Sequence, residues 1–242
     1  MSKKNAKKKS EALVGEVGSP KKIAERHMHR GIVLVGKNDG QKAAIKTINT
    51  HDVSVIYGVP GSGKSMIAMS IGLMGLLSGK YERLVLTRPY LEAGEKMGFL
   101  PGDFNHKIAP FMMPLMEIAQ EQIGKDMITS LIDSGNIQIL PLAYMRGVTL
   151  KNAFVVADEM QNATTQQMRM IFTRLGDNSK LVVTGDTEQS DLYFREKDTK
   201  NGLADCITRL KDVEEIGFFE MLEEHCVRSP IVAKIDKLYK NK

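Results

Sequence analysis

The sequence predicts one α/β domain in which helices cover both faces of a mostly parallel sheet. Short apolar segments alternate along the chain with segments of helical periodicity, the pattern of strands that are buried on both faces. A glycine-rich turn that ends in a lysine follows the first such strand and opens a helix. The chain has 242 residues, 42% of them hydrophobic, which is enough for one sizeable core.

The expected strands are short and rich in aliphatic residues. The first spans 53–57, and the others span 84–87, 137–140, 154–157, 181–184 and 217–221. Segments 154–157 and 181–184 are almost continuously apolar, which indicates strands in the interior of a sheet.

Helices are expected between and after these strands, over 41–48, 65–77, 111–123, 127–134, 165–175, 203–210 and 230–239. The helix over 65–77 carries large apolar side chains, among them Ile67, Met69 and Leu73. Three glycines fall within 91–103, which indicates a loop.

Residues 1–30 form a segment of different composition, with nine basic and three acidic side chains. Its net charge is +6 and that of the whole chain is +5, which leaves −1 for the remainder. We therefore expect a basic, disordered tail over 1–30 and a single domain over 31–242. Such a tail can attract nucleic acid through counterion release, or it can act as a solubilising arm; the sequence leaves both interpretations open.

The start of the chain is polar and lacks the apolar segment of a signal peptide, and no segment approaches a transmembrane helix in length. The two cysteines, Cys206 and Cys226, are expected to be reduced thiols. These features predict a cytoplasmic protein without a membrane partner.

The glycine-rich turn fits the pattern G-x-x-x-x-G-K-[ST] at every fixed position. In this pattern backbone N–H groups surround phosphate oxygens at the positive end of a helix. Lys64 is expected to reach the β and γ phosphates, and Ser65 to offer its hydroxyl to Mg²⁺. The expected nucleotide-binding residues are Gly58, Val59, Pro60, Gly61, Ser62, Gly63, Lys64, Ser65 and Met66.

Two further strands end in polar residues. Asp158 follows the strand 154–157 and is expected to hold the Mg²⁺ shell, and Glu159 beside it is expected to act on the attacking water as general base. Gln161 and Gln189, which follow two apolar strands, are candidates to sense the γ phosphate or to orient water. Gln41 lies shortly before the first strand, where its amide could pair with adenine.

These motifs together resemble those of the PhoH-like ATPases, relatives of the superfamily 1 helicases. The resemblance covers about residues 37–238 and lies in the following segments: Gln41, 58–65, Thr87-Arg88-Pro89, 92–103, 141–147, 157–162, Thr184-Gly185-Asp186 with Gln189, and 227–230. It implies a P-loop NTPase with a RecA-like core, ATP hydrolysis and RNA binding. It also implies that Gln41 reads adenine, that Arg88 contacts the nucleic-acid strand and that Arg228 approaches the γ phosphate. Some relatives carry a PIN nuclease domain before this core, and we expect none here.

ATP hydrolysis of this type generally also uses an arginine near the γ phosphate. The chain is too short for the second core domain that supplies it in helicases. A neighbouring subunit is therefore the expected source, in a homo-oligomeric ring that is expected to be a hexamer. Arg228, Arg146 and Arg174 are the candidates.

The expected role is an RNA-binding motor or helicase-like remodeller. Arg88, Lys96, Arg146 and the basic tail are the expected contacts to single-stranded RNA, with Tyr90, Phe99 and Tyr144 available for base stacking. Two alternatives stay open: a P-loop kinase for a small molecule, and a nucleotide-dependent switch that acts on a client protein. ATP turnover without an acceptor argues against the kinase, and a Glu159→Gln variant separates turnover from binding.

Overall fold

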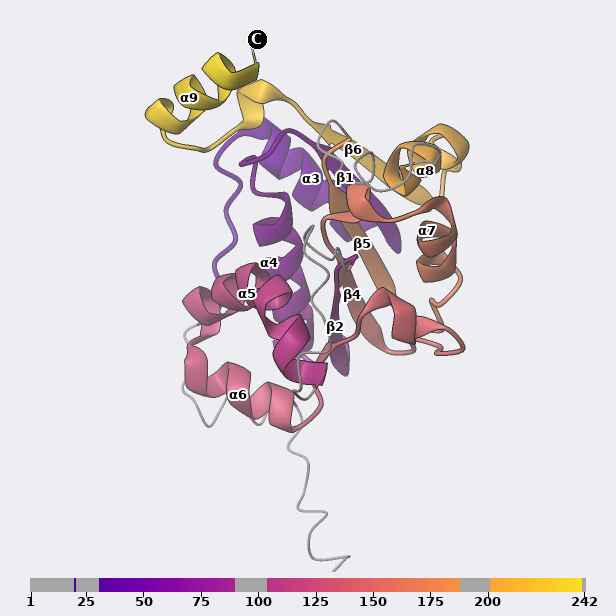
Figure 1. Ribbon diagram of the computed structural model, residues 1–242. Coiled ribbons are helices and arrows are strands. Elements are labelled where there is room, and N and C mark those ends of the chain that lie inside the picture. Colours follow the sequence, from indigo (N-terminus) through magenta and orange to yellow (C-terminus); the bar gives the residue numbers. More distant parts are fainter. Residues whose placement is uncertain (1–19, 21–30, 90–103, 188–200, 241–242) are drawn as a thin grey trace, which may run out of the picture.

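The computed structural model describes Pro20 and residues 31–89, 104–187 and 201–240, which form one α/β domain around a parallel sheet (Figure 1). Its six strands are β1 (Val53–Gly58), β2 (Arg83–Thr87), β3 (Ile137–Ile139), β4 (Ala153–Ala157), β5 (Lys180–Gly185) and β6 (Ile216–Met221). Their order in the sheet is β3-β2-β4-β5-β1-β6, and all neighbouring pairs are parallel.

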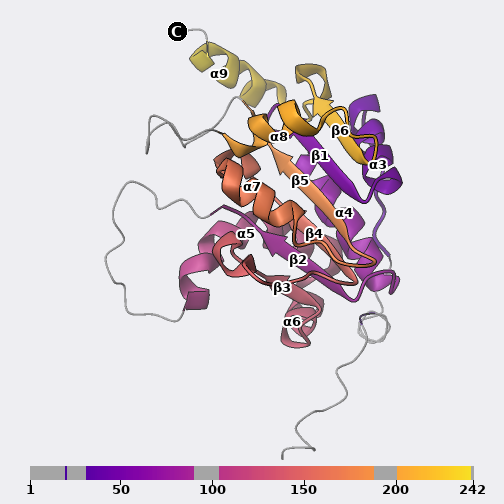
Figure 2. The same cartoon turned by 90° about the vertical axis from the view of Figure 1, so that its right-hand side faces the viewer.

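Helices flank the sheet on both faces, as Figures 1 and 2 show. The described α-helices are α3 (Asp39–Thr50), α4 (Lys64–Leu77), α5 (Phe104–Ile123), α6 (Lys125–Asp133), α7 (Thr165–Phe172), α8 (Gly202–Leu210) and α9 (Pro230–Lys240). Short 3₁₀ turns occur at η1 (Leu142–Met145), η2 (Met160–Asn162) and η4 (Glu223–His225). No helix among the described residues is long and apolar enough to cross a bilayer.

The strands send alternate side chains into two separate cores. In β4, Phe154 and Val156 belong to the core under α3, α4, α5 and α6, whereas Val155 and Ala157 belong to the core under η1, α7 and α8. All four side chains are fully buried. The period of two residues along a strand explains why a continuous apolar segment is required here.

All six expected strands are present, and their bounds differ by one or two residues from the expected ones. The helix expected over 111–123 begins earlier, at Phe104, and continues through Pro110 and Pro114. Each proline removes one backbone hydrogen bond, but neither ends the helix. The expected tail over 1–30 and loop over 91–103 lie outside the described residues, apart from Pro20.

The strand order determines where a site can form. The first strand, β1, lies beside β5, which lies beside β4. Because the strands are parallel, the loops that follow β1, β4 and β5 emerge at the same carboxyl edge of the sheet. Crevices at this edge are where open α/β sheets bind their ligands.

Candidate nucleotide-binding site

The loop between β1 and α4 curls back on itself through three glycines with positive φ: Gly58 at 111°, Gly61 at 76° and Gly63 at 92°. Residues other than glycine rarely adopt such φ values. At Gly58 the space is also closed, because a Cβ there would lie 2.2 Å from the carbonyl oxygen of Met221. The N–H of Val59 donates to that same oxygen at 2.9 Å, which fastens the loop to the end of β6.

Lys64 begins α4, and its side chain folds back over the loop. Its Nζ donates to the carbonyl oxygens of Gly58 and Val59, at 2.7 Å each. Burial lowers the pKa of Lys64, and the nearby carboxylates of the pocket partly oppose this effect. The ammonium group is therefore held at the mouth of the loop by weak neutral acceptors, which the oxygens of a phosphate can replace.

Asp158 follows β4 and connects three neighbouring segments, and its side chain is only 2% exposed. Its Oδ1 accepts from the hydroxyl of Ser65 at 2.7 Å and from the hydroxyl of Thr184 at the end of β5. Its Oδ2 accepts from Nε of Arg88 at 2.9 Å and from Nη2 of Arg88 at 2.5 Å. Arg88 also donates from Nη1 to the carbonyl oxygen of Phe111 at 2.9 Å.

Glu159 is the residue whose backbone is most unusual at this edge. It is exposed and has φ 56° and ψ 36°, the left-handed region that costs a residue with a Cβ about 1–2 kcal/mol. Gln161 donates from Nε2 to Oε2 of Glu159 at 2.5 Å, and its own Oε1 accepts from the N–H of Asp186 at 3.1 Å. This chain of hydrogen bonds orients the Glu159 carboxylate beside the loop, in a strained conformation of the kind that is frequent at functional sites.

These groups surround a pocket of about 300 Å³ at the carboxyl edge. It is lined by Pro60, Gly61, Gly63, Lys64, Ser65, Met66, Ile118, Asp158, Glu159, Asp186 and Arg228. Loop glycines, a lysine, a hydroxyl and carboxylates thus meet in one place although they come from widely separated parts of the sequence.

Arg228 reaches this pocket from the C-terminal part of its own chain. The segment after β6 follows the loop: the N–H of Val227 donates to the oxygen of Gly61 at 3.0 Å. The Arg228 side chain then packs so closely that a Cβ at Gly61 would lie 2.4 Å from its Cγ. Arg228, one of the three arginines expected from a neighbouring subunit, therefore lies at the pocket of its own chain.

Gln41, the expected adenine contact, is a buried residue of α3. Its side chain is fully buried, its Nε2 donates to the oxygen of Ser62 at 2.9 Å and its Oε1 accepts from the N–H of Lys37 at 2.9 Å. It does not line the pocket. In this structure Gln41 supports the loop from behind, because a Cβ at Gly63 would lie 2.8 Å from its Nε2.

The remaining candidates fall into two groups. Arg146 and Arg174 are described and do not line the pocket; Arg146 is exposed after η1, and Arg174 donates to the hydroxyl of Thr173 at 3.4 Å. Gln189, Lys96, Tyr90 and Phe99 lie outside the described residues.

The prediction of individual site residues omitted Thr184 and Asp186, which bond to Asp158 and Gln161 respectively. A signal was available, since Thr184 ends the apolar segment of this strand and Asp186 follows the strand directly. Two contacts carried no signal in the sequence, because only the packing of α5 makes them: Ile118 lines the pocket, and the Phe111 carbonyl oxygen accepts from Arg88.

The donor set suits a nucleotide with Mg²⁺. Positive-φ glycines and the start of α4 provide N–H groups for an anion. Ser65 and Asp158 provide two hard oxygen donors 2.7 Å apart, which is the ligand chemistry that Mg²⁺ prefers beside phosphates. Among the described residues no group of three His, Cys, Asp or Glu side chains is arranged to hold a metal ion without such phosphates.

The chain is similar to one family of known proteins over most of its length. The profile of a family described as PhoH-like protein matches residues 33–240. A PhoH-like protein of Synechocystis is 45% identical over 87% of this chain and 63% of its own length, and one of Bacillus subtilis is 41% identical over 84% and 63%. Protein PhoH of Escherichia coli is 35% identical over 82% of this chain and 56% of its own length. The chain thus spans about three fifths of the length of the curated relatives it matches.

Among solved structures, the Pif1 helicase of Candida albicans aligns with 85% of this chain and 44% of its own. The identity is 14% and the TM-score is 0.37, which is too low to carry an argument about function.

Proposed function

The chain belongs to the PhoH-like protein family, and we propose that it binds ATP with Mg²⁺ and hydrolyses the bond between its β and γ phosphates. The observation that carries this proposal is the hydrogen bond between Ser65 and Asp158, 93 positions apart in the chain. It joins the phosphate loop to the acidic strand end, and the exposed carboxylate of Glu159 follows immediately.

The chain's own groups have separable tasks. The N–H groups of the loop would orient the phosphates, and Lys64 would exchange its two carbonyl partners for phosphate oxygens. Ser65 and Asp158 would hold Mg²⁺, which when bound neutralises charge on the β and γ phosphates. Glu159, oriented by Gln161, would accept a proton from the attacking water, and Arg228 would offset negative charge on the transferred group.

The site favours hydrolysis over transfer to a second small molecule. The carboxylate of Glu159 is exposed and already has a hydrogen-bond donor, an arrangement that suits water activation. A kinase would show no turnover without its acceptor, and a pure switch would be insensitive to Glu159→Gln.

We further propose that single-stranded RNA stimulates the reaction. Tyr144, 58% exposed, and Arg146 lie together at and just after η1, which follows β3 at the same edge as the pocket. An exposed aromatic ring next to a cation is the combination that binds single strands by stacking and phosphate contact. Residues 1–30, whose net charge is +6, favour the same partner.

A steady-state ATPase assay with and without single-stranded RNA, at low and moderate salt, tests both parts. Lys64→Ala is the blank. Glu159→Gln should lower turnover by a factor of about 10²–10⁴ while ATP affinity is kept. The isosteric control Glu121→Gln, at an exposed position of α5, should behave as the unaltered chain.

The outcomes separate the proposals. Equal turnover of Glu159→Gln and the unaltered chain would contradict the assignment of the base. Turnover that RNA does not change at any salt concentration would contradict the RNA partner and leave ATP hydrolysis standing.

A homo-oligomeric ring, hexameric in the simplest case, remains part of this proposal. Arg228 reaches the pocket within its own chain and so does not by itself require a neighbouring copy. Support for the ring comes from the surfaces described next.

A further inference from the structure

The last helix, α9, carries an apolar stripe that the described part of the chain leaves uncovered. Ile231, Ile235 and Leu238 are 62%, 48% and 65% exposed, and Val232 and Tyr239 beside them are 42% and 77% exposed. At 3.6 residues per turn these five side chains fall within an arc of roughly 120°. An apolar stripe of this width is what a helix normally buries against a partner.

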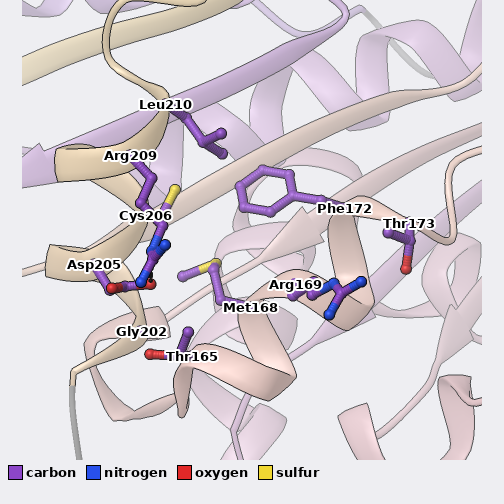
Figure 3. A pocket seen from close by; sticks show the side chains of 10 residues that line it. All are labelled: Thr165, Met168, Arg169, Phe172, Thr173, Gly202, Asp205, Cys206, Arg209 and Leu210. Carbon is purple, nitrogen blue, oxygen red and sulfur yellow. Dashed lines mark hydrogen bonds and ion pairs between the residues drawn. The ribbon is translucent and has the colours of Figure 1, made fainter.

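A complementary hollow lies between α7 and α8, with a volume of about 550 Å³. Figure 3 shows Met168 and Phe172 of α7 and Cys206 and Leu210 of α8 pointing into it. Met168 and Cys206 are almost fully buried and form its floor. We call this hollow the α7–α8 groove.

The rim of the groove is polar and its charge is largely compensated. Arg209 is paired with Asp205 at 2.8 Å, and Arg169 adds one cation. The turn after α8 is different, because Asp212, Glu214 and Glu215 are all exposed there.

The two surfaces cannot meet within one chain. Figures 1 and 2 place α9 on one side of the sheet and α7 and α8 on the other. The segment that leads to α9 is held at the phosphate loop by the hydrogen bond from Val227 to Gly61, which fixes the start of the helix. An apolar helix and an apolar groove on opposite sides of a molecule make a head-to-tail contact between copies possible.

We propose that α9 of one copy of this chain occupies the α7–α8 groove of a second copy. The charges agree with this occupant: α9 contains three lysines and one aspartate, and Lys234 is exposed at the edge of the stripe. Their possible partners are the exposed acidic residues Asp212, Glu214 and Glu215, which follow Leu210 of the groove along the chain. Because such a contact uses two different surfaces, it repeats from copy to copy and closes into a ring when the rotation allows.

The contact also concerns the nucleotide pocket, and in this respect the inference deepens the proposed assembly. The helix begins at Pro230, two positions after Arg228, which lines the pocket. A neighbour that fixes α9 would therefore also fix the segment carrying Arg228. The closing experiment measures mass and not turnover, so failure of this inference and failure of the proposed ATPase are distinguishable.

The experiment is sedimentation of the full chain and of variants that each damage one surface. Leu238→Glu places a charge in the stripe of α9. Thr173→Arg, at the exposed edge of the groove, and Leu210→Arg, in its wall, obstruct the acceptor surface. Met113→Glu is the matched control, because Met113 is a 51% exposed apolar residue of α5 and belongs to neither surface.

We expect the unaltered chain and Met113→Glu to sediment as oligomers and each damaged chain as a 26.9 kDa monomer. An equimolar mixture of Leu238→Glu with a groove variant should form a dimer that does not grow, because the mixture retains one intact helix facing one intact groove. Circular dichroism and binding of a fluorescent ATP analogue establish that the variants are folded.

A monomeric unaltered chain would overturn the inference, as would an oligomer that survives both kinds of damage. A mixture that stays monomeric would also overturn it, since that result indicates a self-complementary contact. Dimers formed only on mixing would establish the head-to-tail arrangement.

Discussion

Removal of Arg88 should destabilise the domain more than removal of any exposed ion-paired arginine. Arg88 is 14% exposed and Asp158 is 2% exposed, so an Arg88→Met substitution leaves a buried carboxylate without its cation. Loss of one partner of a buried ion pair costs about 3–5 kcal/mol. Asp158 keeps the hydroxyl donors of Ser65 and Thr184, so we expect the lower end, about 3 kcal/mol.

Urea unfolding without nucleotide measures this free energy, and a thermal melt should fall by about 6–12 °C. The double variant Arg88→Met with Asp158→Asn removes the stranded charge and should recover about 2 kcal/mol. The matched control is Arg209→Met, which breaks a similar pair with Asp205 on the surface, where the arginine is 66% exposed. Such a surface pair is worth about 0–1 kcal/mol.

Two results would refute this reasoning. An Arg88→Met variant as stable as Arg209→Met would show that the pair contributes no stability in solution. If stability is unchanged and RNA stimulation is lost, Arg88 acts as the strand contact that the family resemblance implies. A double variant whose loss equals the sum of the two single losses would show that the two side chains are not coupled.

Three further predictions concern the loop and the thiols. Gly61→Ala puts a Cβ 2.4 Å from the Arg228 side chain, at a residue with a φ of 76°, and should weaken ATP binding about tenfold. The control is Gly79→Ala, because Gly79 has a φ of 78° but open space around it; ATP binding should be unchanged in the same titration. Burial raises the pKa of Cys206 to about 12, so about 10⁻⁴ of this thiol is thiolate at pH 8. In a timed alkylation followed by mass spectrometry, Cys226 should therefore react before Cys206. Equal rates for the two cysteines would contradict the burial of Cys206. Burial lowers the pKa of Lys64 from 10.5. Because ATP binding needs the charged ammonium group, the affinity for ATP should begin to fall, as the pH is raised, at a pH below 10.5. A fall that begins only above pH 10.5 would be inconsistent with the buried position.

The phosphate loop and the acidic strand end were predictable from the sequence because their chemistry depends on local spacing. The motif consists of consecutive residues: it includes Gly63, which must adopt positive φ, and a lysine at the start of the helix. Such a motif can be recognised without knowledge of the tertiary structure. The six strands were predictable for a similar reason, since burial on both faces demands a continuous apolar segment. Helix boundaries were less predictable, as the early start of α5 at Phe104 shows, because helical periodicity extends over several turns and does not mark the first residue.

The tertiary structure alone determined which distant groups share the pocket. The order β4-β5-β1 brings Asp158, Thr184 and Ser65 within hydrogen-bonding reach, and no local pattern contains that order. It also decided that Gln41 is buried behind the loop and that Arg228 reaches the pocket in its own chain. Local sequence therefore determined what each segment can form and what chemistry it carries, whereas strand order and side-chain packing, which depend on contacts between remote residues, decided which of these groups act together.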